Sequence, residues 1–428
     1  MTSTTAADIE PDVEPDGSGE ARAHGRSSVF WRLWIGSTVS QFGSGVTIVA
    51  LPLVALRIVH ASTFEIGLVS AATVTAWLVV GLPAGVIVHR LPLRPVLLAG
   101  NIIRAVALAS IPVAAALGAL TLAQLIIVAL IVGVASVMFD VGYSTYMPSV
   151  LPPAQLTAGN SFTQGSGQVA QIAGPSLGGT LVQLVGAANA MITNALSYVF
   201  STTMLLSLPA PPQTPQPAEP VRMTAQIRHG LSYTFRDPVI GPLAISATVA
   251  NFVTAGIEAI TVVFLIRTVH VGSATLGLLI AAGSVGGVIG AALTTRLSSR
   301  FGSARVVLMS LVLSPLATLL LPLTERGAGL AFFAIGSAVA GASDVTFSII
   351  ARTHRQIVVP RPLLPQVMAT VRFISWGVLP LGAIIAAALG QALGVRTTLW
   401  IFGVINILGL VAAATPSIRR ARNLVDVA

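Results

Sequence analysis

The chain has 428 residues, of which 54% are hydrophobic and 9% are charged, and its formal net charge is +9. A soluble protein carries about a quarter charged residues, so this composition excludes a soluble globular protein and indicates a chain that crosses a membrane several times. The absence of cysteine excludes disulfides and thiolate metal sites, and the basic residues are all arginines placed between apolar runs, which argues against nucleic-acid binding.

Residues 1–28 differ from the rest of the chain. They hold six acidic and two basic side chains and show no apolar periodicity. A segment of this kind cannot bury enough apolar surface to fold, so the sequence predicts a disordered polar tail. A secretory signal peptide is not expected, because the basic-then-apolar order and a cleavage site are missing.

Apolar runs of about 20 residues, the length at which a helix crosses a bilayer, recur after this tail. We predict twelve spans, at residues 30–59, 66–88, 96–117, 122–146, 161–185, 188–208, 240–269, 276–297, 306–323, 330–350, 367–389 and 397–414. If the tails and alternate loops face the cytoplasm, 19 of the 23 arginines lie on that side. Cytoplasmic loops carry an excess of basic residues, so we expect a multi-pass protein of the inner (plasma) membrane with both termini in the cytoplasm.

The segment between the sixth and seventh spans has two parts. Residues 209–220, PAPPQTPQPAEP, are half proline and predict an extended linker. Beyond it, apolar residues recur every fourth position, at Met223, Ile227, Leu231 and Phe235. This stripe favours a helix lying on the cytoplasmic membrane face, with a plain loop as the alternative. The predicted units are a tail (1–28), a six-helix bundle (29–208), a cytoplasmic linker (209–237), a second six-helix bundle (238–414) and a tail (415–428).

The two halves of the chain resemble each other. TVSQF at 38–42 matches TVANF at 248–252, and RIVH at 57–60 matches RTVH at 267–270, both at an offset of 210. At an offset of 204, Asp140 matches Asp344. Several matches in order indicate two repeats, and parallel repeats of this kind place a ligand site at their interface near the middle of the membrane.

Two repeats of six spans with a long central linker and Arg-rich cytoplasmic loops resemble the major facilitator superfamily over residues 29–414. The superfamily's signature after the second span is a glycine, three residues, Asp-Arg, then glycine and further basic residues. The segment GVIVHRLPLR at 85–94 matches it at Gly85, Arg90 and Arg94, but His89 stands in place of the acid and Pro92 in place of the later glycine.

The fifth span contains GPSLGG, which fits the antiporter signature of the superfamily with Gly174, Pro175, Gly178 and Gly179. Residues 139–161 also resemble the branch that contains macrolide, tetracycline and siderophore exporters. The resemblance implies an all-α fold of two pseudo-symmetric six-helix bundles and proton-driven export of amphipathic small molecules. A metabolite importer or facilitator of the same fold, and a membrane scaffold or sensor that transports nothing, remain as alternatives.

Charged residues inside the spans are candidates for function, because each is costly in lipid. In the superfamily an acid at the position of Asp140 pairs with the signature arginine and holds the cytoplasmic gate closed. We carry this role to Asp140 with Arg90 or Arg94, while Arg104 lies in the next span, and to Asp344 with Arg296 or Arg300. A permanent ion pair that only makes burial tolerable is the equally weighted alternative.

Glu258 lies well inside the seventh span, with Asn251, Thr254 and Thr261 on the same helix face. The matching face of the first span carries Gln41 and Ser44. Two polar faces in related helices suggest the lining of a cavity. Removal from water disfavours the charged form of a carboxyl, so Glu258 is a candidate for proton coupling together with Asp140 and Asp344. A carboxyl that only holds helices together is the alternative.

Further polar residues are candidates for the substrate cavity. Gln164, Gln168 and Gln171 follow the spacing of one helix face, and helix packing explains them equally well. Arg372 and Trp376, four residues apart, are suited to an acidic or aromatic ligand, with snorkelling of Arg372 to the cytoplasmic interface and plain packing of Trp376 as the alternatives. No Walker sequence and no metal-ligand spacing of histidines is present, so we expect no enzyme, no cofactor and no metal. The expected partners are a small-molecule substrate, protons and the bilayer, without nucleic acid, for a monomer.

Overall fold

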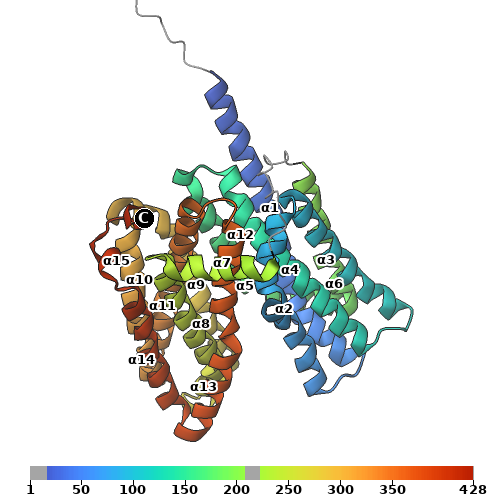
Figure 1. Cartoon of the computed structure of the whole chain (residues 1–428). Coiled ribbons are helices and arrows are strands. Elements are labelled where there is room, and N and C mark those ends of the chain that lie inside the picture. Colours follow the sequence, from blue (N-terminus) through green and yellow to red (C-terminus); the bar gives the residue numbers. More distant parts are fainter. Residues whose placement is uncertain (1–16, 208–221, 428) are drawn as a thin grey trace, which may run out of the picture.

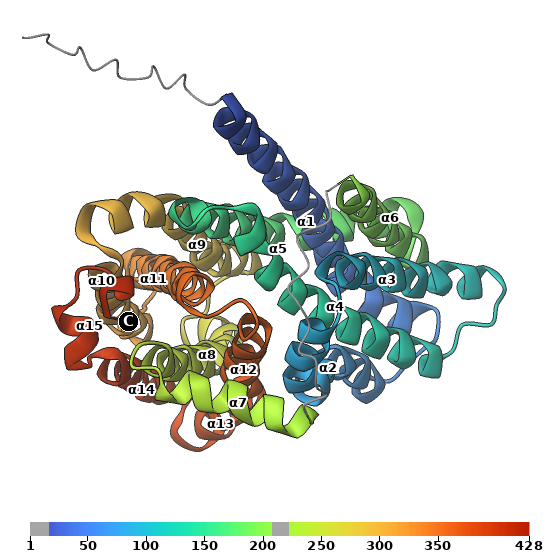
Figure 2. The ribbon, with the colours of Figure 1, turned by 45° about the horizontal axis from the view of Figure 1, so that its top comes forward.

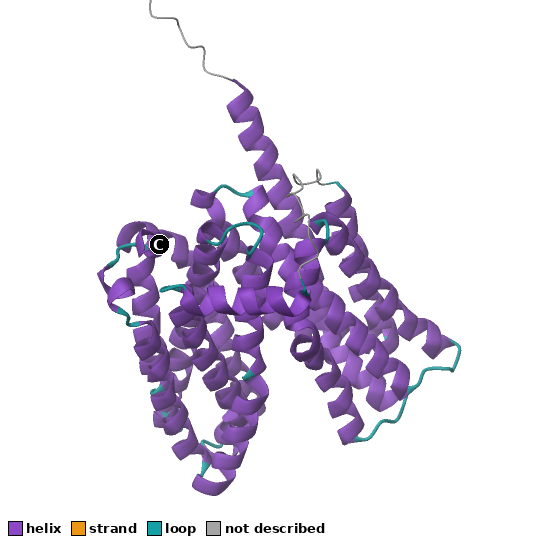
Figure 3. Cartoon of the chain, in the orientation of Figure 1, coloured by secondary structure: helices purple, strands orange, loops and turns teal. Residues whose placement is uncertain are grey.

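The computed structural model of the protein describes residues 17–207 and 222–427. These residues form helices joined by short loops, and no strand occurs among them (Figure 3). The helices assemble into two bundles that lie side by side, and both ends of the described chain lie toward the top of Figure 1. This confirms the predicted all-helical membrane fold.

The first bundle contains α1 to α6, with bounds Gly17–Arg57, Thr63–Arg90, Leu93–Ala116, Leu122–Val150, Pro153–Val185 and Ala187–Leu206. The connecting helix α7 is Met223–Arg236. The second bundle contains α8 Ile240–Val263, η1 Phe264–Thr268, α9 Ser273–Phe301, α10 Ser303–Thr318, η2 Leu321–Leu323, η3 Gly327–Gly329, α11 Leu330–Val358, α12 Leu364–Gly377, α13 Leu379–Leu393 and α14 Val395–Ala413. The short elements α15 Pro416–Arg420 and η4 Leu424–Val427 follow.

Each predicted span falls on helix, and the eleventh is divided into α12 and α13 at Val378. Pro380 follows this break and lacks the backbone N–H that would bond to the preceding turn, so the helix is interrupted here. Nine helical segments of the described chain are long and apolar enough to cross a membrane. The segments α2, α5 and α6 fall outside that set, and α5 and α6 bury polar side chains against other helices.

The described part of the N-terminal tail is helical. The first helix begins at Gly17, whereas the sequence predicts a polar tail as far as residue 28. The sequence after Pro15 contains alanine, arginine and glutamate, which favour helix, and no further proline interrupts it before the first span. The helix of the first span therefore continues toward the N-terminus as far as Gly17 at little cost in free energy. Residues 1–16 of the predicted tail, and the predicted proline linker at 209–220, lie outside the described residues.

The backbone repeats the internal similarity of the sequence. His60 and His270, which match in the two halves, are the two described non-glycine residues with positive φ, at 55° and 59°. Each ends a helix in the same way: Ala61 N–H donates to the Ala55 carbonyl, and Val271 N–H donates to the Leu265 carbonyl. Such bonds satisfy the last carbonyls of a helix when one residue turns left-handed. The positive φ and the hydrogen bond recur at matching positions, so the backbone repeats the pattern that the sequence shows.

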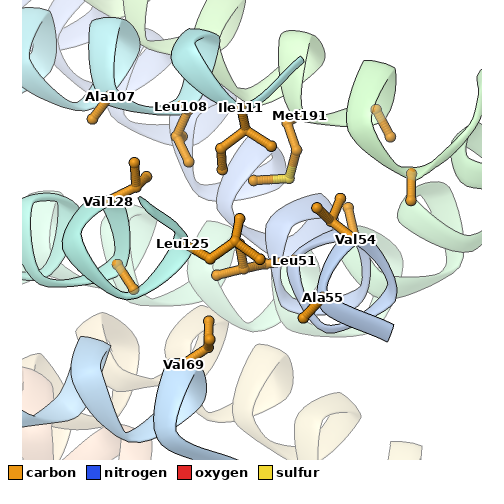
Figure 4. Close-up of a cluster of buried hydrophobic side chains, with 14 of the residues drawn as sticks. Leu51, Val54, Ala55, Val69, Ala107, Leu108, Ile111, Leu125, Val128 and Met191 are labelled. Atoms are coloured by element: carbon orange, nitrogen blue, oxygen red, sulfur yellow. The ribbon is translucent and has the colours of Figure 1, made fainter. Parts of the chain in front are cut away.

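Each bundle has its own apolar core. In the first, side chains from α1 to α6 form one cluster, and Leu51, Leu108, Leu125 and Met191 are among its members (Figure 4). Between α1 and α5 the helices are close enough that a Cβ on Gly174 would lie 2.7 Å from the Gly45 Cα. Membrane helices associate through such close packing rather than through hydrophobic burial, since lipid is as apolar as leucine.

The connecting helix α7 lies across α12 and α8 and reaches α2 (Figure 2). Its buried residues are Gln226, Gly230 and Thr234, not the apolar stripe picked out in the sequence. Met223 and Phe235, at the ends of that stripe, are exposed. A Cβ on Gly230 would come 3.1 Å from the Gln366 side chain, so the small residue explains which face packs against the protein. The apolar stripe is left for another apolar surface, as on a helix at a membrane face.

Candidate functional site

A cavity of about 230 Å³ lies between the two bundles. The first bundle contributes α2 and α4 to its lining, and the second contributes α8, α11 and α12. Its charged lining residues are Asp140, Asp344, Arg352, Arg355 and Arg372, and its tryptophans are Trp77 and Trp376. The cavity therefore combines cations, acids and aromatic rings at the interface of the repeats, where the sequence predicts a ligand site.

Asp140 and Arg372 join the two bundles across this cavity. The Arg372 guanidinium donates to a carboxylate oxygen of Asp140 at 3.4 Å, and the side chains are 44% and 25% exposed for Asp140 and Arg372. The same guanidinium lies 3.6 Å from the ring centroid of Trp376 and 4.9 Å from that of Trp77. Attraction between a cation and an aromatic face holds Arg372 in this place as well as the ion pair does.

The partner predicted for Asp140 was therefore wrong. Arg94 instead donates to the carbonyls of Leu205 and Leu206 at the end of α6, with the Leu206 bond at 2.6 Å. Arg90 donates to the Gln226 side chain of α7 at 3.3 Å. Arg94 thus satisfies the last carbonyls of α6, and Arg90 holds α7 against the first bundle. Both contacts use the guanidinium groups that an ion pair with Asp140 would need.

Arg104 is also engaged away from the cavity. It is buried, bonds to the Asn101 side chain and the Gly100 carbonyl, and lies over the rings of Phe139 and Tyr198. It serves as an internal cation within the first bundle, surrounded by amide and aromatic groups rather than by carboxylates.

Asp344 has a hydroxyl partner in place of the predicted arginine. Ser314 Oγ donates to its carboxylate at 3.0 Å, and Asn406 donates to Ser314 Oγ at 3.1 Å. Arg296 and Arg300 are exposed, and Arg300 lies over the ring of Phe301. The repeat therefore places matching acids in one cavity but gives them different neighbours.

Only part of the predicted polar face of α8 lines the cavity. Asn251 and Thr254 line the cavity, as predicted. Glu258 is one turn further along α8, is exposed, and does not belong to the cavity lining. Thr261 is buried and donates to the Ile257 carbonyl of its own helix. Of the predicted polar face, Asn251 and Thr254 line the cavity and Glu258 does not.

Several other predicted cavity residues pack helices instead. Gln41 donates to Ser37, and Ser44 shares a hydrogen bond with the Tyr198 hydroxyl. Gln164 donates to Ser348 of the second bundle at 3.4 Å, and a Cβ on Gly287 would lie 2.9 Å from the Gln168 side chain. Gln171 is exposed. For Gln164 and Gln168 the structure favours the packing alternative.

The GPSLGG segment lies on α5 against α1. A Cβ on Gly178 would lie 3.0 Å from the Val46 Cα, next to Gly45, which Gly174 contacts. A Cβ on Gly179 would meet nothing within 4 Å. Pro175 stands inside the helix, where it removes one backbone donor. Two of the three glycines therefore permit close helix packing.

The sequence prediction missed Trp77, Arg352 and Arg355 in the cavity. Both arginines follow the predicted end of their span at residue 350, so the sequence predicts them in a cytoplasmic loop. The helix α11 continues to Val358, and its last turns are enclosed by the facing bundle. Their spacing of three residues, which places both on one helix face, was the available signal.

Direct contacts between the bundles concentrate near the end of the molecule that holds both termini, where α4 and α11 end and α5 begins. Asn160 of α5 donates to Thr353 Oγ1 at 2.8 Å and to Gln356 Oε1 at 2.7 Å, and Gln356 donates to the Ser144 carbonyl at 2.9 Å. The two bundles diverge toward the bottom of Figure 1. The described conformation is thus held together at the termini end.

Replacing Asn160 with alanine should loosen this end. Loss of two buried hydrogen bonds costs about 1–3 kcal/mol, which changes a two-state ratio by roughly fivefold to a hundredfold. The chain has no native cysteine, so spin labels on Gln155→Cys and Arg361→Cys report the separation of the bundles without background. We expect a new, longer distance population. The control Asn189→Ala removes an amide that is bonded only within the first bundle, to the Val185 carbonyl at the end of α5, and an identical distance shift in it would contradict the role of Asn160.

Comparisons with known proteins agree with this architecture. The family model described as transmembrane secretion effector matches residues 21–425. The chain is 27% identical to the multidrug efflux pump Tap of Mycolicibacterium fortuitum over 389 residues, covering 88% of this chain and 93% of that one. It is 24% identical to Tap of Mycobacterium tuberculosis over 390 residues, covering 88% and 91%.

Solved structures share the fold. A bacterial homologue of the iron transporter ferroportin in an outward-facing state superposes with a TM-score of 0.77 at 15% identity, over 90% of this chain and 98% of that one. The human organic anion transporter MFSD10 gives 0.73 at 17% identity, over 91% and 99%. The match to the family model over nearly the whole chain, together with this fold, shows that the protein belongs to the transmembrane secretion effector family of major facilitator transporters.

Proposed function

We propose that this transporter exports amphipathic small molecules in exchange for protons by alternating access. The relatives named as multidrug efflux pumps support export as the direction. The cavity between the repeats, held closed by contacts near the termini end, is the arrangement that alternating access requires. With the predicted cytoplasmic termini, the described conformation faces outward.

The observation that carries the proposal is the ion pair between Asp140 and Arg372, because it joins the two bundles inside the cavity. Protonation of Asp140 removes the charge that attracts Arg372, so the pair weakens when a proton binds and reforms when it leaves. A proton can in this way change how firmly the bundles are held together. Asp344 is a second carboxyl in the same cavity, and Glu258 is a third on the exposed part of α8.

Proton exchange supplies enough energy for export. One elementary charge crossing the membrane is worth about 2.3 kcal/mol per 100 mV. A potential of roughly 150 mV therefore sustains a concentration gradient of about two to three decades for a substrate exchanged with one proton.

Accumulation in an efflux-deficient bacterium tests the proposal. Cells that express the protein should accumulate less of at least one compound from a panel of macrolides, tetracyclines, dyes and aromatic acids, and a protonophore should restore accumulation. Asp140→Asn should abolish the difference, whereas the exposed-loop variant Arg361→Gln should keep it. Export that a protonophore leaves intact would contradict proton coupling, and increased accumulation would favour a metabolite importer.

A further inference from the structure

The charges of the cavity do not balance. Its lining holds three arginines and two carboxylates. Arg372 is paired with Asp140, and Asp344 accepts a hydrogen bond from Ser314. Arg352 and Arg355 form no ion pair with any carboxylate of the described chain. Among the described residues, the cavity thus holds one more cation than carboxylate groups, and two of its arginines make no direct ion pair.

Arg355 shows this most clearly. Its Nε is buried and has no hydrogen-bond partner among the described residues, and the same holds for the Nε of Arg372. Burying a cation without a partner is costly, whereas the planar fork of a guanidinium matches the two oxygens of a carboxylate. Arg355 also lines the cavity, so an oxyanion bound there would supply the carboxylate partner that its guanidinium lacks.

The cavity is also polarised along its length. Arg352 and Arg355 occupy the last turns of α11, at the closed termini end, and Ser348 continues the same helix face away from it. Trp376 lies one turn beyond Arg372 on α12, further from the termini end, and Trp77 faces it with ring centroids 5.4 Å apart. A ligand with its anionic group at the closed end would place an apolar body beside these rings.

The size of the cavity suits a compact ligand. Its volume of about 230 Å³ lies below the range of about 300–1,000 Å³ that is usual for drug-sized ligands. A bicyclic aromatic acid is of the right order for this volume.

We propose that the cargo of this cavity is a small amphipathic organic anion, an aromatic body that carries one carboxylate or a comparable oxyanion. The inference rests on the proposed function only in that the cavity is the transport site. Arg352 and Arg355 hold the anionic group, and Trp77 and Trp376 contact the aromatic body.

Calorimetric titration of the purified full chain with three matched probes tests the proposal: 2-naphthoate, the neutral 2-naphthamide and the cationic 2-naphthylmethylammonium. We expect the carboxylate to bind at least about tenfold more tightly than the other two, since a charge-assisted bidentate pair is stronger than a neutral hydrogen bond. Equal or tighter binding of the amide or the ammonium, or no binding of any probe, would overturn the proposal.

Variants locate the site. Arg355→Gln should weaken 2-naphthoate binding about tenfold and leave 2-naphthamide binding unchanged. Arg300→Gln, on the exposed face of α9, should leave both unchanged. A carboxylate preference that persists in a folded Arg355→Gln protein would overturn the assignment, and the wild-type comparison decides the ligand class if that variant does not fold. Because this measurement needs no flux, anion binding without export contradicts only the proposed function, and export without anion preference contradicts only this inference.

Discussion

Replacing Arg372 with methionine is expected to abolish export and to destabilise the protein. Removing one member of a buried ion pair leaves the other charge uncompensated, at a cost of about 3–5 kcal/mol when burial is complete. The Asp140 side chain is 44% exposed, so water screens it and we expect about 1–3 kcal/mol here. Thermal unfolding of the purified protein, followed beside accumulation in cells, measures both effects.

A double-mutant cycle separates the pair from the other contacts of Arg372. Asp140→Asn alone should also destabilise the protein, and the double variant with Arg372→Met should be more stable than the sum of the single effects predicts. Additive effects would show that the two charges do not interact. Loss of the stacking on Trp376 and Trp77 appears in both variants that lack Arg372 and therefore cancels in the cycle.

Gly174→Ala is expected to destabilise the protein markedly, although alanine is the better helix former. The added Cβ would lie 2.7 Å from the Gly45 Cα, so α1 and α5 must move apart. Overpacking of this kind costs about 1–3 kcal/mol, more than the gain of about 1 kcal/mol in helix propensity. We expect a lower melting temperature and reduced export, because these helices belong to one rigid bundle.

The same motif supplies the control. A Cβ on Gly179 would meet nothing within 4 Å, so Gly179→Ala should be neutral or slightly stabilising. Equal melting temperatures for the two variants would show that the motif does not act through close packing of α1 on α5. The comparison is matched, since both substitutions add one methyl group to the same helix.

The sequence determined the class of this protein because hydropathy, arginine placement and internal repetition are local properties that need no contact to be read. The apolar runs place each helix, and the paired RIVH and RTVH segments reappear as helix ends with left-handed histidines at His60 and His270. The two acids that match between the repeats, Asp140 and Asp344, both line the cavity.

Only the tertiary structure decided which charges meet. Asp140 pairs with Arg372, which lies 232 residues away in the other half, and no spacing rule relates such positions. Arg94 does not pair with Asp140, because it donates instead to carbonyls at the end of α6 that have no partner within their own helix. Arg352 and Arg355 read as loop residues because hydropathy cannot distinguish a helix end in water from one enclosed by a facing bundle. The site thus depends on how two bundles approach, and that approach is set by packing between helices distant in sequence.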